Sequence, residues 1–94
     1  MDVRYFLDPE TDQPHIYDHG VTKTEVEQVL RGPGEDLSAA SGARMKLGQT
    51  IAGRYLQVIY VLDHDSNGVF VITAYDLQGK AKKAFRRRQR RRPR

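Results

Sequence analysis

The clearest pattern of hydrophobic and polar residues predicts a helix over residues 21–30. Thr22 and Glu25 have the spacing of a capping box, in which each side chain bonds the backbone amide of the other. Val26 and Val29 then begin an apolar stripe at helical spacing. The helix is therefore expected to begin at a well-defined residue and to bury one face.

Three later segments predict strands because their side chains alternate or are apolar throughout. In residues 43–50 apolar and polar side chains alternate, as in a strand with one buried face. Residues 54–62 and 69–75 are apolar on both faces, which is typical of central strands. Tight turns are predicted at residues 51–53 and at the Asn-Gly pair 67–68. The three strands are therefore expected to form an antiparallel meander.

Turn-forming residues separate these elements. Gly32 is expected to end the first helix in the left-handed conformation, with Pro33 after it. Residues 32–42, rich in Gly, Ser and Ala, are predicted to be a loop, and residues 4–7 a short strand. The predicted fold class is α+β: a small antiparallel sheet, made of the N-terminal strand and the meander, packed with an N-terminal helix and a basic C-terminal helix.

The basic C-terminal helix has a narrow apolar side made of Ala81, Ala84 and Phe85. No apolar residue follows Phe85, so the end of this helix is expected to fray. Residues 1–85 are interpreted as one domain and residues 86–94 as an Arg-rich tail.

One face of the predicted sheet is expected to stay partly open. The stripes of the two helices suffice to cover a single face of the sheet. The residues expected to line the open face are Tyr55, Gln57, Tyr75 and Arg44. A ligand site is predicted on this face.

Positive charge is concentrated at the C-terminal end. Ten of the 16 Lys and Arg residues lie in residues 80–94, which contain no acid, whereas the other six share residues 1–79 with all 12 acids. Such a split favours a polyanion, and RNA is the expected partner. The alternatives are a solvated terminus, a tail that lies against the protein's own acidic body, and an acidic protein partner. The expected RNA contacts are Arg44, Lys46, Lys82, Lys83, Arg86, Arg87, Arg88, Arg90 and Arg91.

Composition excludes several classes of function. A chain of 94 residues has room for one modest core, and no cofactor is expected. Without cysteine there is no disulfide, thiolate nucleophile or Cys-based zinc site, which fits a cytoplasmic protein. The N-terminus does not resemble a signal peptide, and the apolar runs are too short to span a bilayer, so no membrane association is expected.

Candidate catalytic groups are those that metal-independent RNA cleavage requires. The reaction needs a group that deprotonates the 2′-hydroxyl, a cation beside the phosphate and a proton donor for the leaving oxygen. His19 and Tyr75 are candidates for proton transfer or base stacking, and Arg54 for stabilising charge on the phosphate. Each residue type is also common at surfaces, and His19 has an equally good interpretation as a packing residue at the helix entry.

A metal site is not predicted. His15 and His19 lie four residues apart, a spacing that binds zinc on a helix, but Pro14 and Gly20 bracket them. No third ligand is evident nearby in the sequence, and the Glu of a His-Glu-x-x-His motif is missing.

The order of several short motifs resembles a known family. These are His-Gly-Val-Thr (19–22), Glu-Val-Glu-Gln-Val-Leu (25–30), Leu-Gly-Gln-Thr (47–50), Gly-Arg-Tyr-Leu-Gln-Val-Ile-Tyr (53–60) and Val-Ile-Thr-Ala-Tyr-Asp (71–76). Together they are similar to the BrnT-like branch of the RelE/ParE toxin superfamily, over about residues 15–90.

The resemblance implies a RelE-like fold, endoribonuclease activity on mRNA, including mRNA on the ribosome, and a cognate antitoxin that also binds DNA. His19 matches the family's His-Gly-Val start, Arg54 its Gly-Arg strand opening, and Arg86 and Arg87 fall near its basic helix positions. Two departures are visible. Tyr75 stands where BrnT-like toxins often carry Arg, and the N-terminal Trp of that branch is absent.

Three functions follow as hypotheses. The first is a metal-independent endoribonuclease toxin of a type II toxin–antitoxin pair, which cleaves mRNA and inhibits translation. The second is a non-catalytic RNA- or ribosome-binding module that uses the Arg-rich C-terminus. The third is an interaction protein whose basic helix docks on an acidic partner.

Overall fold

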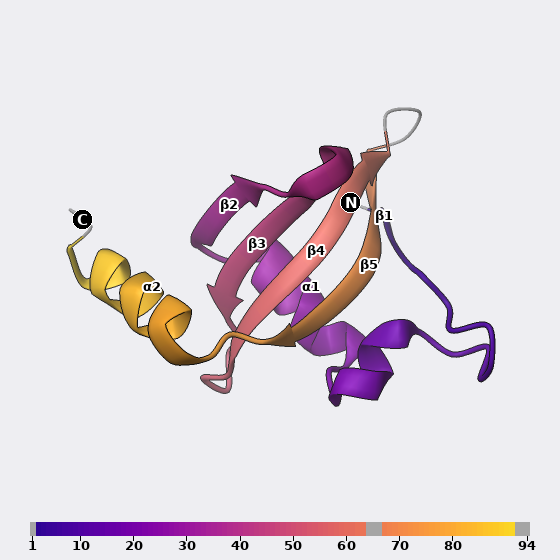
Figure 1. Ribbon diagram of the computed structural model, residues 1–94, viewed down its shortest axis with the longest axis horizontal. Helices are drawn as coiled ribbons and strands as arrows, with labels where there is room; N and C mark the ends of the chain where they lie inside the picture. The colour runs from indigo at the N-terminus through magenta and orange to yellow at the C-terminus, as the bar shows by residue number, and fades with distance from the viewer. Residues whose placement is uncertain (1, 64–66, 92–94) are drawn as a thin grey trace.

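A computed structural model describes residues 2–63 and 67–91 of the chain (Figure 1). The two short 3₁₀ helices are labelled η. In chain order the elements are β1 (Asp2–Tyr5), η1 (His15–His19), α1 (Lys23–Arg31), β2 (Gly34–Ser38), η2 (Ala40–Gly42), β3 (Arg44–Gln49), β4 (Tyr55–Asp63), β5 (Gly68–Asp76) and α2 (Gly79–Arg91).

The strands form one five-stranded mixed sheet in the order β1-β5-β4-β3-β2. The predicted meander is confirmed, since β3, β4 and β5 pair antiparallel with β4 in the centre. The expectation of a purely antiparallel sheet is wrong, because β1 pairs parallel to β5. A parallel pair needs a long crossover, and the chain between β1 and β5 supplies one by passing through the rest of the fold.

The segment predicted to be a loop, residues 32–42, contains β2 and η2. β2 is an edge strand, paired antiparallel with β3. Its acidic residues leave it without the run of apolar side chains that predicts a strand. Gly32 has φ −88° and ψ 176°, so it is extended and not left-handed as predicted. Pro33 disfavours a helical conformation in the residue before it, and the chain passes directly into β2.

The predicted start of α1 is confirmed in detail. The Thr22 hydroxyl accepts a hydrogen bond from the Glu25 amide at 3.2 Å, and the Glu25 carboxylate accepts one from the Thr22 amide at 3.0 Å. Val21 and Val26, on either side of this cap, are both buried in the main core. The capping box therefore fixes where the helix enters the fold.

The main hydrophobic core lies between α1 and one face of the sheet. Val26 and Val29 of α1 are buried with Leu56, Val58 and Tyr60 of β4. These β4 positions alternate with Tyr55, Gln57 and Ile59, whose side chains must point to the other face. Figure 1 shows α1 behind the sheet, with the other face toward the viewer.

α2 packs on the face opposite α1, which corrects the prediction that both helices cover the same face. Phe85 is buried with Leu47 and Leu77, and Met45 and Tyr55 pack against this second cluster. Ala81, assigned to the apolar side, is exposed. The Arg run after Phe85 was expected to fray, but α2 continues as a helix to Arg91. The rest of the predicted tail, and most of the turn before Asn67, fall outside the described residues.

Within residues 2–63 and 67–91, no helix is long and apolar enough to cross a bilayer.

The position of the core predicts how much each β4 side chain contributes to the free energy of unfolding. Leu56→Ala should lower the free energy of unfolding by about 2–5 kcal/mol, because Leu56 is fully buried and its removal leaves a cavity. Leu62→Ala on the same strand is the control, because that side chain is 50% exposed, and its cost should stay below about 1 kcal/mol. Urea denaturation followed by circular dichroism measures both. Equal losses for the two variants would contradict this placement of the core.

Candidate nucleic-acid interface

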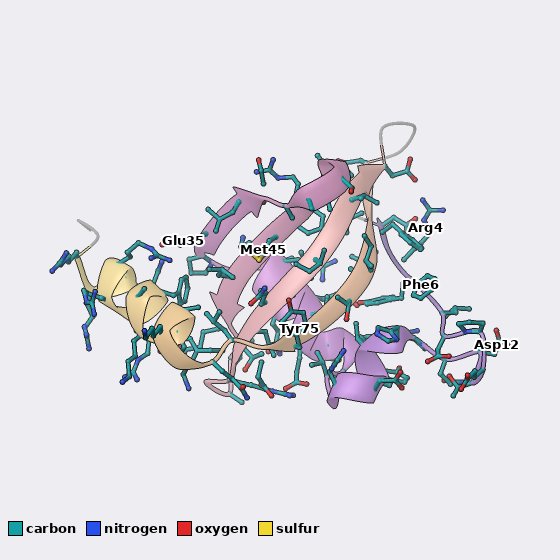
Figure 2. All side chains as sticks on the ribbon, viewed as in Figure 1. Arg4, Phe6, Asp12, Glu35, Met45 and Tyr75 are labelled. Atoms are coloured by element: carbon teal, nitrogen blue, oxygen red, sulfur yellow. The ribbon has the colours of Figure 1, made fainter. Side chains whose placement is uncertain are left out.

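The open face of the sheet presents a row of polar and aromatic side chains. Tyr75 of β5 and Met45 of β3 lie on it (Figure 2). Gln57 of β4, opposite Tyr75 in the register, lies there too, as predicted for Gln57 and Tyr75. The Gln57 amide nitrogen donates to the Tyr75 hydroxyl at 2.9 Å and lies 3.0 Å from the Met45 sulfur. The three side chains are thus held together as one surface.

The structure brings the two candidate proton-transfer residues together. The rings of His19, at the end of η1, and Tyr75, near the end of β5, have centroids 5.7 Å apart. His15 follows at 5.4 Å from His19, and Phe6 at 6.2 Å from His15. His19 is exposed and Tyr75 half-buried, so this chain of rings remains accessible beside the open face.

Arg54, the third predicted catalytic residue, is bonded to the protein itself. Its Nε and Nη2 donate to the two oxygens of Asp76 at 2.7 and 3.2 Å, and its Nη1 donates to Glu25 at 3.1 Å. Nη1 also donates to the Gly20 carbonyl at 2.8 Å, and Nη2 to the His19 carbonyl at 3.5 Å. These contacts use all five N–H donors of a guanidinium. Arg54 therefore joins η1, α1 and β5.

The charges in this cluster stabilise one another. The hydrogen bonds to Asp76 are the largest cause that raises the pKa of Arg54 above its ordinary value. The same bonds are the largest cause that lowers the pKa of Asp76. The pKa of Glu25 is also lowered, first by the Thr22 amide and further by Arg54. Sequence reasoning named Arg54 but missed both acids as its partners, although Glu25 was already assigned to the capping box.

Arg44 and Lys46 lie away from the open face. Arg44 aligns with Tyr60 in the sheet, which places it on the α1 face, and it pairs with Asp36 at 2.9 Å. The prediction that Arg44 lines the open face is therefore wrong. Burial and Asp36, which accepts from the Tyr60 hydroxyl, raise the pKa of Tyr60 to about 12. The Lys46 ammonium donates to the Gly32 carbonyl at 3.0 Å.

The cations of α2 separate into held and unpaired groups. Lys82 and Arg86 lie over the ring of Tyr55, 5.0 and 5.7 Å from its centroid. Arg88 forms a two-pronged pair with Glu35 of β2, at 2.6 and 2.7 Å. No ion pair within residues 2–63 and 67–91 engages the remaining cations predicted to bind RNA. These are Lys83, Arg87, Arg90 and Arg91.

One cluster has the composition of a metal site. Ligand atoms of Asp8, His15 and Asp18 all lie within 4.8 Å of one another, so the structure supplies the partners for His15 that the sequence did not reveal. His15 Nδ1 is 3.3 Å from Asp18 and 3.8 Å from Asp8. This geometry is also that of an ordinary surface ion-pair cluster, and nothing else at the site points to a metal ion.

Comparison with known proteins found no matching family model, no matching curated protein and no matching solved structure.

The bonds of Arg54 predict a structural role that substitution would reveal. Arg54→Met should lower the free energy of unfolding by about 2 kcal/mol, because it leaves Glu25 and Asp76 without their main cationic partner. Arg31→Met is the control: Arg31 pairs with Glu27 on the exposed side of α1, and its loss should cost less than about 0.5 kcal/mol. Chemical denaturation at pH 7 measures both, and an Arg54 variant as stable as the control would remove this role.

The same cluster predicts that the stability contributed by Arg54 is lost in acid. A carboxylate whose folded-state pKa is depressed adds stability that is complete above its unfolded pKa and is lost as pH falls through the folded one. The pKa values of Glu25 and Asp76 are lowered from their ordinary values of 4.5 and 3.8. The stability gap between the wild type and Arg54→Met should therefore be constant above about pH 5 and narrow below pH 4. A gap that persists unchanged at pH 3 would contradict the ionic origin of the effect.

Proposed function

We propose that this protein binds single-stranded RNA across the open sheet face and the adjoining surface of α2. The observation that carries the proposal is that Lys83, Arg87, Arg90 and Arg91 have no ion pair within residues 2–63 and 67–91. They lie on a helix that packs, through Phe85, on the sheet face with the polar and aromatic side chains. A helix with no acid and several unpaired cations attracts phosphates, since each neutralised phosphate releases counterions.

The geometry favours single strands over duplexes as the ligand. Bases of an unpaired strand stack on aromatic rings, at about 1–3 kcal/mol per base. Tyr55 lies beside the cations of α2. Tyr75 lies on the neighbouring strand opposite Gln57, and its ring contacts that of His19. A strand whose phosphates follow α2 would thus meet rings suited to its bases.

A second candidate function is that of a metal-independent endoribonuclease toxin acting on mRNA, controlled by a cognate antitoxin. It is favoured by one observation, the contact between the exposed His19 ring and Tyr75. In this proposal His19 and Tyr75 transfer protons or orient the 2′-hydroxyl, and an unpaired α2 cation faces the phosphate. Arg54 then acts as a positioning residue, because its guanidinium binds the His19 and Gly20 carbonyls.

RNA binding is tested on the outer side of α2. Replacing Lys83, Arg87 and Arg91 with Gln should weaken binding of a labelled single-stranded RNA at least tenfold at 100 mM salt. It should also make the slope of log affinity against log salt shallower by about 2, because each phosphate that the protein neutralises adds about 0.7 to that slope. Fluorescence anisotropy at several salt concentrations gives both values.

The matched control removes three charges from the body of the protein, with Arg4, Lys23 and Arg31 replaced by Gln. Net charge changes equally in the two triple variants, so a general charge effect would weaken RNA binding equally in both. That result, or no binding by the wild type at 50 mM salt, would sink the proposal.

Cleavage is tested separately. His19→Ala should reduce cleavage of end-labelled RNA by a factor of about 10²–10⁴ in the presence of EDTA, the range expected for loss of a general acid or base. RNA affinity should change little. Tyr17→Phe, at an exposed position on η1, is the control and should cleave normally. If RNA stays intact after incubation with the wild type, the endoribonuclease proposal is wrong and only the proposed RNA binding remains.

A further inference from the structure

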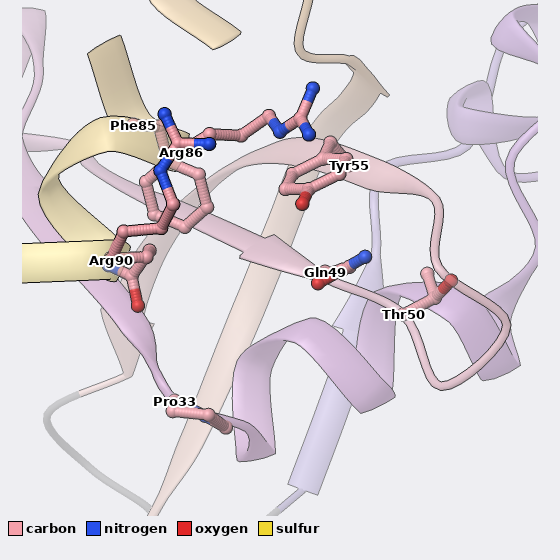
Figure 3. A pocket seen from close by; sticks show the side chains of 8 residues that line it. Pro33, Gln49, Thr50, Tyr55, Phe85, Arg86 and Arg90 are labelled. Atoms are coloured by element: carbon pink, nitrogen blue, oxygen red, sulfur yellow. The ribbon is translucent and has the colours of Figure 1, made fainter. Parts of the chain in front are cut away.

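A hollow of about 390 Å³ lies between α2 and the end of the sheet (Figure 3). Tyr75 and Gln57 are not among the residues that line it. This volume falls within the range of about 300–1,000 Å³ common for small-molecule sites. Tyr55 and Phe85 supply rings with centroids 6.1 Å apart. The other polar residues that line it are Gln49, Thr50, Gln89, Arg86 and Arg90.

Gln89 carries an unsatisfied donor. Its side-chain nitrogen is buried and has no hydrogen-bond partner among the described residues. Leaving a buried amide donor unpaired costs about 1–3 kcal/mol, so such a group calls for an explanation. An acceptor oxygen on a ligand in the hollow is the partner that this donor lacks. The Gln49 amide nitrogen, in contrast, already donates to the Gly53 carbonyl at 3.1 Å.

Two cations stand at the hollow with no ion pair within the described residues. Arg86 lies over the ring of Tyr55, and Arg90 is one turn further along α2. Between them in the sequence, Arg88 pairs with Glu35 of β2. A ligand with both a planar ring and a phosphate matches this combination of rings, an amide donor and guanidinium groups.

We propose that this hollow binds one nucleotide, with its base against Tyr55 and near Gln89, and its phosphate at Arg86 and Arg90. The inference rests on the proposed RNA-binding function and gives it a subsite that holds a single nucleotide of the strand. The base edge accepts the Gln89 hydrogen bond. Uracil offers carbonyl oxygens and adenine offers ring nitrogens as acceptors, so the subsite tells a nucleotide from a bare phosphate.

The test titrates the full chain with UMP, AMP, ribose 5-phosphate and inorganic phosphate, and follows side-chain amide signals by NMR. UMP or AMP should shift the Gln89 side-chain signal, and the two probes without a base should leave it in place. Gln89→Leu should weaken mononucleotide binding about tenfold. Gln78→Leu, an exposed amide just before α2, is the matched control and should bind as the wild type does.

Each outcome decides between the subsite and the wider function. Equal shifts with inorganic phosphate would show an anion site only and overturn the nucleotide assignment, as would unchanged affinity in Gln89→Leu. RNA binding that depends on Lys83, Arg87 and Arg91, without any mononucleotide shift, would remove the subsite and keep the proposed function. Base-dependent shifts without RNA binding would support a site for free nucleotides and remove the RNA function.

Discussion

The guanidinium of Arg54 is the interaction on which the functional end of the molecule depends. It bonds the carbonyls at the end of η1, the Glu25 carboxylate in the first turn of α1 and the Asp76 carboxylate at the end of β5. The same Glu25 carboxylate also accepts the Thr22 amide in the capping box. One cation therefore sets the position of η1, and with it the distance between His19 and Tyr75. Because two carboxylates neutralise its charge, the contribution of Arg54 is to hold η1 in position.

Strand alternation divides the sheet into two surfaces with different roles. On β4, Leu56, Val58 and Tyr60 are buried against α1, whereas Tyr55 and Gln57 remain on the opposite face. α2 covers only one end of that face, through Phe85 and the pair between Arg88 and Glu35. The core supplies the stability, and the uncovered face is free to carry polar and aromatic groups. The polar and aromatic side chains of this face are thus carried by strands instead of by loops.

Local patterns predicted the parts of the fold that local physics decides. The capping box at Thr22, the central strands and their turn at residues 51–53 follow from short-range spacing, and all were confirmed. β2 and the parallel β1 were missed or wrongly paired, because edge pairing depends on partners distant in sequence. His19 and Tyr75 were predicted to share a role in proton transfer or base stacking, but their contact was not predicted. The bonds of Arg54 and the hollow under α2 arise from tertiary packing, which no spacing in the sequence shows.

The charge on α2 links its conformation to its ligand. Thirteen residues from Gly79 to Arg91 contain no acid, so neighbouring cations repel one another along the helix. Tyr55 and Glu35 offset part of this repulsion by holding Lys82, Arg86 and Arg88. Within the described part of the chain, no ion pair or ring contact of this kind holds Lys83, Arg87, Arg90 or Arg91. A polyanion bound there, as the proposed function requires, would remove the remaining repulsion and stabilise the folded helix by mass action. In that proposal the phosphates that α2 binds would also stabilise α2.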